Sequence, residues 1–477
     1  MRISWFSLFT LAFLLCAAIP SATLASASSN FLKCFELKTN LSNSSSGVVF
    51  TPSTSSYSSI LQSPAETPEP EIIIRPLNTS HIQAAVTCAE ESNLNIRTQS
   101  WGHDYEYEGV SYVSKNIPFI LVDLSNLRSI KFDVENNIAW VDSGTTLGEL
   151  YHAIAEKTNT YGFPAGTCPT VGVGGHFIST GGGMGPLSRK YGLAADNIDD
   201  VRMVDAKGRA LDRKSMGEGP FQAIIRGASF GIITSWKLKL VPVPTTVTVF
   251  NIQRTLEQGA TKLVLKWQAV GLGSNFSKDL FIRLVIGASD SASGNSNKTI
   301  VVRFAAVYLG PSAQLLTMMD ASFPELGVQQ TDCIEMSWIQ SVLYEAGFPF
   351  TGSIDVLLNR TKPNKSYFKA NSDYVNFVKE PMSEEGLEGL WKLLIEEEES
   401  GYMIWTPYGG VMSEFPVSQT PFPHRNGNLF EIQYYMATWQ ASNGAEGPVN
   451  WIRSLYSYVA GFCFKHSKAC LPSLQRS

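Results

Sequence analysis

The change in strand pattern near residue 244 is the feature that most limits how this chain can fold. Before it, short apolar runs bounded by turns alternate with helical stretches, and the spacing predicts strands over 71–75, 119–124 and 138–144 and helices over 77–91 and 147–157. After it, longer alternating runs predict strands over 248–253, 280–286 and 299–308, with helices between them. We therefore expect an α+β domain followed by a second domain built on a large antiparallel sheet.

The composition excludes several classes of protein. The chain has 477 residues, 44% of them hydrophobic, which is enough for about two or three domains with large cores. Its net charge of −5 leaves no basic surface for nucleic acid and no polybasic membrane patch. We expect neither nucleic acid nor membrane as a partner, and we expect no metal site.

The first residues are typical of a secretory signal peptide. Arg2 precedes an apolar run and small residues follow it, so we assign residues 1–27 to a signal that is removed. No later run reaches the length of about 18 apolar residues that a membrane helix needs. The Asn-x-Ser/Thr sequons also favour a secreted glycoprotein, and they lie at Asn40, Asn43, Asn78, Asn275, Asn297, Asn359 and Asn364.

The cysteines divide into structural and reactive candidates. Cys34 and Cys88 flank the start of the mature domain, and an oxidising compartment would allow them to form a disulfide. Cys333 is expected to be a buried structural thiol, the commoner fate of a lone cysteine. Cys168 remains unpaired in a glycine-rich turn, which is an unusual place for an inert thiol.

His103 and Cys168 both lie in glycine-rich turns. An imidazole and a thiol can each add to the electrophilic rim of a flavin ring, which predicts a doubly tethered FAD. The glycines at 172–175 and 181–185 would let backbone amides approach the phosphates and ribose of that cofactor. Each residue also has a purely structural interpretation: His103 as a packed polar side chain in a turn, and Cys168 as an inert buried thiol.

Five strings occur in an order that is far more specific than any one motif: Trp101–Glu106, Cys168–His176, Arg189–Asn197, Glu335–Gln340 and Pro421–Arg425. Through them the chain resembles the berberine bridge enzyme-like family of plant FAD-linked oxidases, within the vanillyl-alcohol-oxidase type of flavoproteins, over nearly its whole length. The resemblance implies a two-part PCMH-type FAD-binding domain over 28–243, and a substrate-binding antiparallel-sheet domain flanked by helices over 244–420. It also implies a C-terminal return to the FAD domain over 421–477, which departs from the family after about residue 460.

The resemblance implies a set of cofactor contacts, with His103 and Cys168 as covalent anchors of a bicovalent FAD. The further residues in this set are Ser100, Gly102, Val171, Gly172, Gly174, Gly175, His176, Gly182, Gly183, Asn197, Gly227 and Ile232. His176 has a structural role as its alternative. Val171 matches the position that gates oxygen in the family, and its small side chain favours an oxidase.

Three further residues are implied in substrate oxidation. Glu414 is the first candidate for the base that takes the hydroxyl proton, and Tyr105 and Gln433 complete the set. Glu414 has a solvated loop carboxylate as its alternative, because some family members place a lysine two residues before the glutamine, where this chain has Glu431. Trp101 stands where the family keeps a glycine near the cofactor.

The sequence thus predicts a secreted FAD-dependent oxidase. It would remove hydride from a hydroxylated substrate, which is a carbohydrate, a monolignol or a specialised metabolite, and reduce O2 to hydrogen peroxide. The alternative is a non-catalytic or truncated relative that does not retain flavin. We expect a monomer in the apoplast or cell wall, with the vacuole or vesicles derived from the endoplasmic reticulum as other locations.

Overall fold

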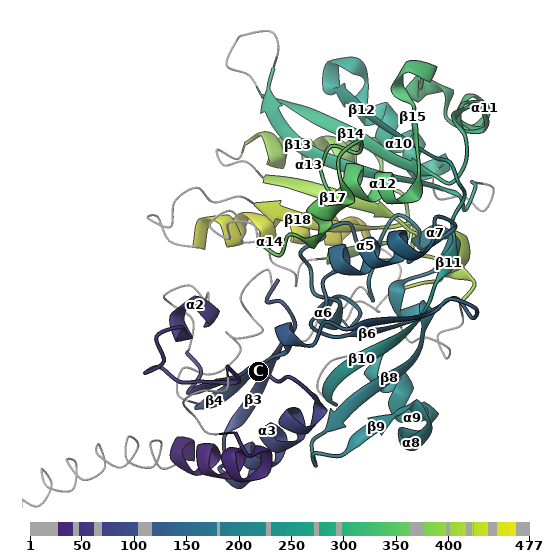
Figure 1. The fold of residues 1–477 in the computed structure, drawn as a ribbon. Helices are drawn as coiled ribbons and strands as arrows, with labels where there is room; N and C mark the ends of the chain where they lie inside the picture. Colours follow the sequence, from purple (N-terminus) through teal and green to yellow (C-terminus); the bar gives the residue numbers. More distant parts are fainter. Residues whose placement is uncertain are drawn as a thin grey trace, which may run out of the picture.

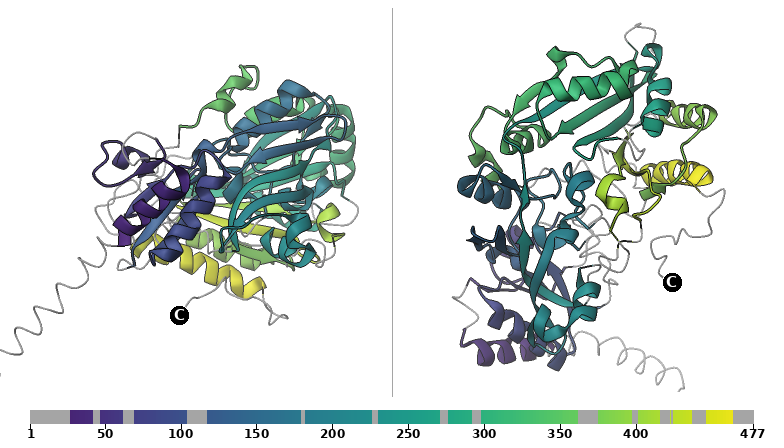
Figure 2. Two further views of the ribbon diagram at one scale, coloured as in Figure 1. Left: turned by 60° about the horizontal axis from the view of Figure 1, so that its bottom comes forward. Right: turned by 90° about the vertical axis from the view of Figure 1, so that its right-hand side faces the viewer.

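Two sheet-containing units lie one above the other in the computed structural model, the first at the bottom of Figure 1 and the second at the top. The view from the side in Figure 2 shows the same two tiers. The chain passes between them after β11 (Val241–Pro242), which pairs with β7 (Tyr161–Gly162). The structure describes residues 27–41, 47–61, 69–103, 117–178, 182–225, 230–270, 276–291, 298–361, 375–396, 401–415, 422, 424–436 and 446–463.

The N-terminal part of the first unit is a four-stranded sheet of order β1-β2-β4-β3, in which β2, β4 and β3 run parallel. Every residue of β2 and β4 is buried, as expected for parallel strands that are covered on both faces. The elements are β1 (Val49–Phe50), α2 (Tyr57–Leu61), β2 (Ile72–Ile74), α3 (Thr79–Glu91), β3 (Asn95–Gln99), β4 (Phe119–Asp123) and η1 (Leu124–Asn126). The Asn78 side chain caps α3 by accepting the backbone N–H of His81.

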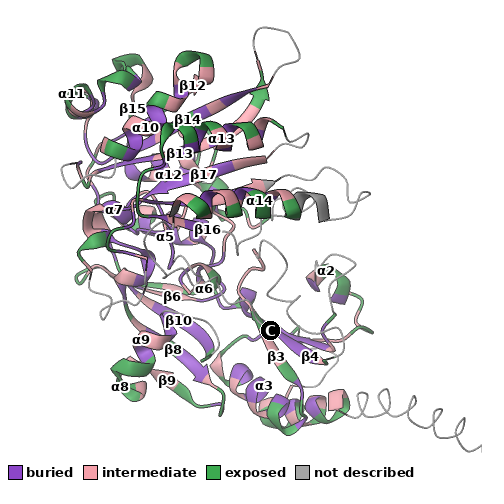
Figure 3. Cartoon of the chain, turned by 180° about the vertical axis from the view of Figure 1, so that it is seen from behind, coloured by how far each residue is buried: buried purple, intermediate pink, exposed green. Residues whose placement is uncertain are grey.

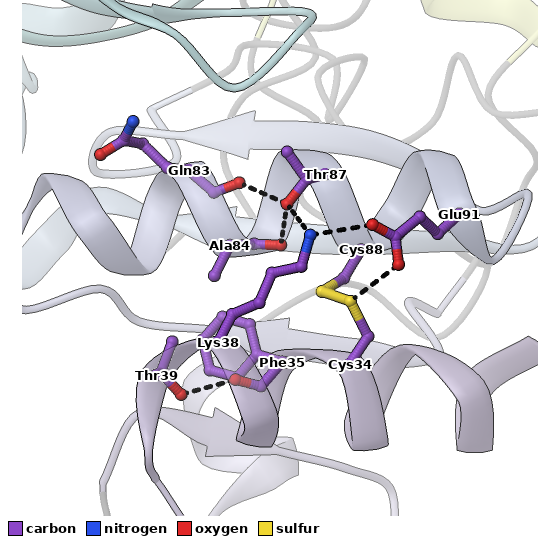
Figure 4. Close-up of a disulfide and its surroundings, with 9 residues drawn as sticks. All are labelled: Cys34, Phe35, Lys38, Thr39, Gln83, Ala84, Thr87, Cys88 and Glu91. Carbon is purple, nitrogen blue, oxygen red and sulfur yellow. Dashed lines mark hydrogen bonds and ion pairs between the residues drawn. A yellow bond between two sulfur atoms is a disulfide. The ribbon is translucent and has the colours of Figure 1, made fainter.

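A disulfide joins this sheet's helix to the first helix that the structure describes. Cys34, on the helix over residues 27–39, pairs with Cys88 of α3, with a Cα–Cα distance of 5.7 Å. Figure 4 shows Lys38 beside the disulfide, where its ammonium donates to Glu91 at 2.8 Å and to Thr87 at 3.1 Å. The predicted pairing of Cys34 with Cys88 is therefore present.

The second part of the first unit is an antiparallel sheet of order β5-β6-β10-β8-β9. Its elements are β5 (Ile130–Asp133), β6 (Ile138–Asp142), α5 (Leu147–Lys157), α6 (Val173–His176), α7 (Ser188–Tyr191), η2 (Ala194–Asn197), β8 (Ile198–Asp205), β9 (Ala210–Asp212), α8 (Arg213–Met216), α9 (Glu218–Ile224) and β10 (Gly231–Lys239). Helix α5 begins where the sequence predicts, because Thr146 and Glu149 form a reciprocal capping box.

The second unit is built on a seven-stranded antiparallel sheet of order β15-β12-β14-β13-β17-β18-β16. Its strands are β12 (Val247–Thr255), β13 (Leu280–Asp290), β14 (Lys298–Tyr308), β15 (Ile334–Met336), β16 (Val375–Val378), β17 (Gly401–Pro407) and β18 (Phe430–Met436). Its helices are η3 (Leu256–Gln258), α10 (Ala260–Val270), α11 (Ser312–Ser322), η4 (Pro324–Leu326), η5 (Gln330–Asp332), α12 (Trp338–Glu345), η6 (Ile354–Leu358), α13 (Glu384–Ile395), η8 (Gly410–Ser413) and α14 (Glu446–Cys463).

The two faces of this sheet differ in chemistry because side chains alternate along each strand. On the outer face, Leu284, Trp405 and Ile432 are fully buried in a core that they share with α10, α13 and α14. In Figure 3 the strands there are largely buried, while the helices carry exposed residues on their outward sides. The outer face therefore supplies the main apolar core of the second unit.

The inner face carries polar side chains. Thr406 and Glu431 are direct partners on β17 and β18, and Arg283 of β13 lies next to them in register. At the end of the same face, Val249 and Val307 pack in a core that extends into the first unit. The polar inner face is thus turned toward the first unit.

The described residues of the C-terminal segment, for which a return to the first unit over 421–477 is expected, contact both units. Strand β18 belongs to the seven-stranded sheet, and Ile452, Leu455 and Val459 of α14 are buried in the outer core of that sheet. The apolar stripe of α14 matches the apolar outer face, so the helix packs there. Contact with the first unit is made by Arg425, described below, and residues 464–477 lie outside the described ranges.

Within the described ranges, no helix has the length and apolarity required to cross a membrane. The same ranges contain no group of three or more side chains placed to hold a metal ion. The expected signal peptide lies outside the described residues except for residue 27.

Candidate active site

The turn between β6 and α5 holds together the two glycine-rich turns that the sequence singles out. The Ser100 hydroxyl donates to the carbonyl of Ser143 at 2.5 Å, and the backbone N–H of Gly174 donates to the same carbonyl at 3.2 Å. The N–H of Val173 donates to the carbonyl of Thr145 at 2.9 Å. Both turns are therefore fixed to one short piece of backbone in the first unit.

His103 reaches the turn that carries Cys168. Its Nε2 lies 3.0 Å from Oγ1 of Thr170, a hydrogen bond whose direction depends on the histidine tautomer. Thr170 is two residues from Cys168, and the N–H of Val171 closes that turn by donating to the Cys168 carbonyl at 3.2 Å. The structure thus brings together the two turns that contain the candidate anchors.

The Cys168 thiol is accessible but lies in protein surroundings. Its side chain reaches solvent and forms no disulfide. Burial nevertheless raises the pKa of the Cys168 thiol, and the Arg283 guanidinium of the polar inner face opposes this rise. Cys168 is thus exposed as a residue, while its sulfur interacts electrostatically with Tyr151 and Arg283.

His176 supports the start of the same turn. Its Nε2 accepts the backbone N–H of Gly166 at 2.9 Å. Burial lowers the pKa of His176 to about 4, so the ring is neutral at physiological pH and can act as this acceptor. The hydrogen bond to Gly166 gives His176 a structural part in this turn.

Close packing requires glycine at several of the predicted positions, including Gly172, Gly174 and Gly183. A Cβ on Gly172 would lie 2.2 Å from Oγ of Ser100, and one on Gly183, which has a φ of +83°, would lie 2.5 Å from Cβ of Ala194. Gly175 differs, because nothing lies within 4 Å of the position of its Cβ. Its backbone is therefore open to close approach by a ligand.

The other predicted cofactor contacts have varied surroundings. Asn197 donates from Nδ2 to the carbonyls of Tyr191 and Leu193, each at 2.9 Å, which ties α7 to η2. Ile232 is buried in the apolar core of the N-terminal sheet. Gly102 and Gly182 adopt positive φ angles of 63° and 57°. Tyr105 and Gly227 lie outside the described residues.

The site fits an FAD cofactor on three observations. The Cys168 thiol is accessible beside the His103 turn, and the backbone at Gly175 faces open space. In addition, the Thr145 hydroxyl is buried and has no hydrogen-bond partner among the described residues, at the turn that joins both anchoring turns. A phosphate or ribose oxygen of the cofactor would satisfy such a hydroxyl.

A buried carboxyl group with polar partners lies on the inner face of the sheet. Glu431 accepts hydrogen bonds from the Tyr408 hydroxyl at 2.9 Å and from Nε2 of Gln433 at 2.8 Å, and the Tyr435 hydroxyl donates to Gln433 at 2.7 Å. Burial raises the pKa of Glu431, and the two hydrogen bonds to it act in the opposite direction. Glu431 can therefore change its protonation state closer to neutral pH than an exposed carboxyl group can.

The predicted base Glu414 has different surroundings. It follows η8 with an exposed side chain and forms an ion pair with Lys278, itself about half exposed. Of the two glutamates, Glu431 is thus the one that hydrogen bonds to the predicted Gln433. The sequence reasoning noted Glu431 but assigned it no role, and its position two residues before Gln433 on one strand was the signal that both share a face.

Sequence reasoning also missed Arg283 and Glu345. Arg283 donates from Nη2 to Glu345 of α12 at 2.9 Å, and both side chains are largely buried. Burial raises the pKa of Glu345, and Arg283 opposes this rise. The pair places a cation on the inner face near Cys168, and the alternation along β13 was the signal that could have identified it.

Comparison with known proteins agrees with this geometry. A family model described as an FAD binding domain matches residues 70–213. Berberine bridge enzyme-like 24 of Arabidopsis thaliana is 46% identical over 458 residues, which are 93% of this chain and 82% of that protein. Monolignol oxidoreductase AtBBE-like 13 of the same plant is 48% identical over 406 residues, covering 84% and 74%. Tetrahydroberberine oxidase of Berberis wilsoniae is 45% identical over 479 residues, covering 97% and 87%.

Solved structures show the same fold. The structure of BBE-like #28 from Arabidopsis thaliana superposes with a TM-score of 0.81 at 43% identity, covering 92% of this chain and 86% of that one. A variant of Phl p 4 in which valine replaces isoleucine, described as a glucose oxidase, superposes with a TM-score of 0.80 at 38% identity, with the same coverage of each chain. The chain therefore belongs to the berberine bridge enzyme-like family of plant FAD-linked oxidoreductases.

Proposed function

We propose that this protein is a secreted oxidase that removes hydride from the carbon of a hydroxylated small molecule and reduces O2 to hydrogen peroxide. The observation that carries the proposal is the hydrogen bond between His103 and Thr170, because it joins the histidine turn to the turn of the accessible Cys168. We propose that these two residues hold FAD bicovalently. When bound, FAD supplies the hydride acceptor and the route of electrons to oxygen.

Glu431 is the base that the geometry favours. A substrate between the polar inner face and the first unit would meet Glu431 together with Gln433, which is hydrogen bonded to it. The raised pKa of Glu431 suits a group that takes a hydroxyl proton, because proton transfer is most efficient when the pKa of the base lies near the working pH. Glu414 would first have to break its ion pair with Lys278 before it could accept a proton. Tyr105 remains a candidate for a second residue in substrate oxidation.

The inner face favours an aromatic alcohol as the substrate. Phe377 is the strand partner of Glu431, and Tyr435 stacks on Tyr402 with ring centroids 5.1 Å apart. Aromatic rings beside polar hydrogen-bonding groups suit a ring that carries hydroxyl groups. Monolignol oxidoreductase AtBBE-like 13, which is 48% identical, supports the same class. Carbohydrates and specialised metabolites are the other classes to test.

The proposed location is the apoplast or cell wall. The Cys34–Cys88 disulfide requires an oxidising compartment, and the sequon asparagines Asn40, Asn78 and Asn359 are exposed. We propose a glycosylated monomer whose partners are the small-molecule substrate and O2. The small side chain of Val171, at the position that resembles the family's oxygen gate, supports the use of oxygen.

Flavin content decides between this function and a non-catalytic relative. The full chain is produced in a eukaryotic secretory host, precipitated with acid and examined for visible absorbance. Yellow colour that stays with the polypeptide supports the oxidase, and a colourless product would leave the non-catalytic alternative. A peroxide assay with cinnamyl alcohols, sugars and alkaloids then identifies the substrate class, and the aromatic-alcohol assignment is overturned if peroxide forms with sugars or alkaloids alone.

A further inference from the structure

Trp101 makes a contact that links the His103 turn to a distant part of the chain. Its indole Nε1 donates to the carbonyl of Arg360 at 3.2 Å. The Arg360 guanidinium lies over the indole ring, 3.8 Å from the ring centroid, which is a cation–π arrangement. Trp101, two residues before His103, is therefore held by two contacts to the same arginine.

Arg360 is itself fixed by the first unit. It forms an ion pair with Glu149 of α5, and its Nη2 donates to the carbonyl of Gly144 at 3.0 Å. Glu149 also accepts the N–H of Thr146 at 2.8 Å, as part of the capping box at the start of α5. Arg360 thus bridges Trp101 and the turn between β6 and α5, which also holds the Cys168 turn.

The segment that carries Arg360 is packed closely on α5. Asp355 of η6 lies 3.1 Å from Nε2 of His152, and a Cβ on Gly148 would lie 2.2 Å from the carbonyl oxygen of Leu357. This segment follows α12 in the chain and precedes β16 of the second unit. A docked segment from outside the first unit therefore determines where Arg360 meets Trp101.

The opposite side of the turn is restrained as well. The Ser100 hydroxyl is bonded to Ser143, and the backbone of Gly172 approaches Ser100 too closely for any side chain at that position. Trp101 is therefore held from two directions, by the Cys168 turn on one side and by Arg360 on the other. Only Gly102, which adopts a left-handed φ of +63°, separates Trp101 from His103, so the position of Trp101 sets where the chain enters the His103 turn.

We propose that Trp101 and Arg360 form a clamp that positions His103 for covalent attachment of the flavin, so that both are positioning residues. The proposal rests on the bicovalent FAD of the proposed function. Attachment forms a bond between an imidazole nitrogen and the ring methyl carbon and breaks one methyl C–H bond. The imidazole N–H proton and the methyl proton are released, the two electrons of the C–H bond reduce the flavin, and O2 takes up two electrons and two protons to give hydrogen peroxide. Such a step needs the imidazole and the methyl group in close alignment.

The test separates the two flavin linkages. Trp101→Ala is made in a Cys168→Ala background, where His103 alone can attach the flavin, and in a His103→Ala background, where Cys168 alone can attach it. Flavin that stays with the acid-precipitated polypeptide is divided by total flavin before precipitation. We expect this covalent fraction, sampled during incubation with FAD, to rise about fivefold more slowly in the first background, which is the scale of a partly desolvated cation–π contact, and to be unchanged in the second.

Matched variants keep the result interpretable. Trp101→Phe retains a ring face for Arg360 and should restore most of the rate, and Arg360→Ala should reproduce the loss seen with Trp101→Ala. Arg128→Ala is the control, because Arg128 pairs with the other oxygen of Glu149 at 3.4 Å and is about half exposed. Equal loss in both backgrounds, or loss in neither, overturns the clamp. A wild-type chain without covalent flavin overturns the proposed function itself, and this is seen before any variant is compared.

Discussion

The Arg425 guanidinium and the Asp196 carboxylate form an ion pair in which neither side chain is exposed to solvent. Two parallel hydrogen bonds join them, with distances of 2.9 and 2.5 Å. Arg425 precedes β18 in the chain and Asp196 belongs to η2, so the pair connects the strand of Glu431 to the first unit. Arg189 of α7 makes a second connection by donating to the carbonyl of Tyr408, the residue that hydrogen bonds to Glu431.

Removing one member of the Arg425 pair should be strongly destabilising. Arg425→Ala leaves the Asp196 carboxylate buried without its cation, so we expect the free energy of unfolding to fall by about 3–5 kcal/mol. Denaturant unfolding measures this loss. Arg209→Ala breaks an exposed ion pair with Asp205 and should cost about 1 kcal/mol or less. Similar losses in the two variants would contradict the assignment of a buried pair.

The Cys34–Cys88 disulfide should contribute to stability through the unfolded chain. The two residues are 54 positions apart, so replacing both with serine should lower the free energy of unfolding by about 4 kcal/mol. Cys333→Ser is a suitable control, because Cys333 is a free and only partly buried cysteine. The prediction fails if the double replacement unfolds at the same denaturant concentration as the wild-type chain.

Glu431 should control the pH dependence of turnover. A base must be ionised to accept a proton, and burial raises the pKa of Glu431, so activity should rise with pH as this carboxyl group loses its proton. Glu431→Gln should lower turnover by about a hundredfold or more and remove that limb of the profile. Glu414→Gln is the matched control and should leave turnover within about twofold of the wild-type value. If Glu414→Gln lowers turnover more than Glu431→Gln does, Glu414 is the base.

His176 should make the protein sensitive to acid. Because burial lowers its pKa from 6.5 to about 4, the neutral ring stabilises the fold above pH 6.5, and this contribution is lost as the pH falls from 6.5 through 4. His176→Gln retains an acceptor for the Gly166 N–H but cannot titrate. The difference in unfolding free energy between pH 7 and pH 4 should therefore be smaller in this variant than in the wild-type chain, and an unchanged difference would argue against a buried neutral histidine.

Cys168→Ala should leave the flavin attached through His103 alone. Loss of the second tether should lower the reduction potential of the bound flavin, because the thioether stabilises its reduced form. The measurement is a redox titration of the variant beside the wild-type chain. Cys333→Ala serves as the control, and identical absorbance and potential in the Cys168→Ala variant and wild type would remove Cys168 from the cofactor site.

Local rules account for the elements that were predicted well. Helix α5 begins after Thr146 because its cap bonds are made within four residues, and β8 and β9 pair across a short turn at Lys207. Helix α14 shows the limit of such rules. Its amphipathic pattern predicts an apolar stripe but not which core receives that stripe, and in the folded chain the stripe packs on the outer core of the second unit.

The candidate site also combines residues that the sequence identifies with relationships that only the folded chain creates. The sequence alone identifies the glycines, the unpaired Cys168 and the motif around His103. Backbone conformation and thiol chemistry depend on residue type and on near neighbours in the chain. The choice between Glu414 and Glu431 as candidate base, and the meeting of Trp101 with Arg360, depended on residues far apart in sequence. Burial and electrostatic environment arise from packing across strands and units, so these relationships exist only in the folded chain.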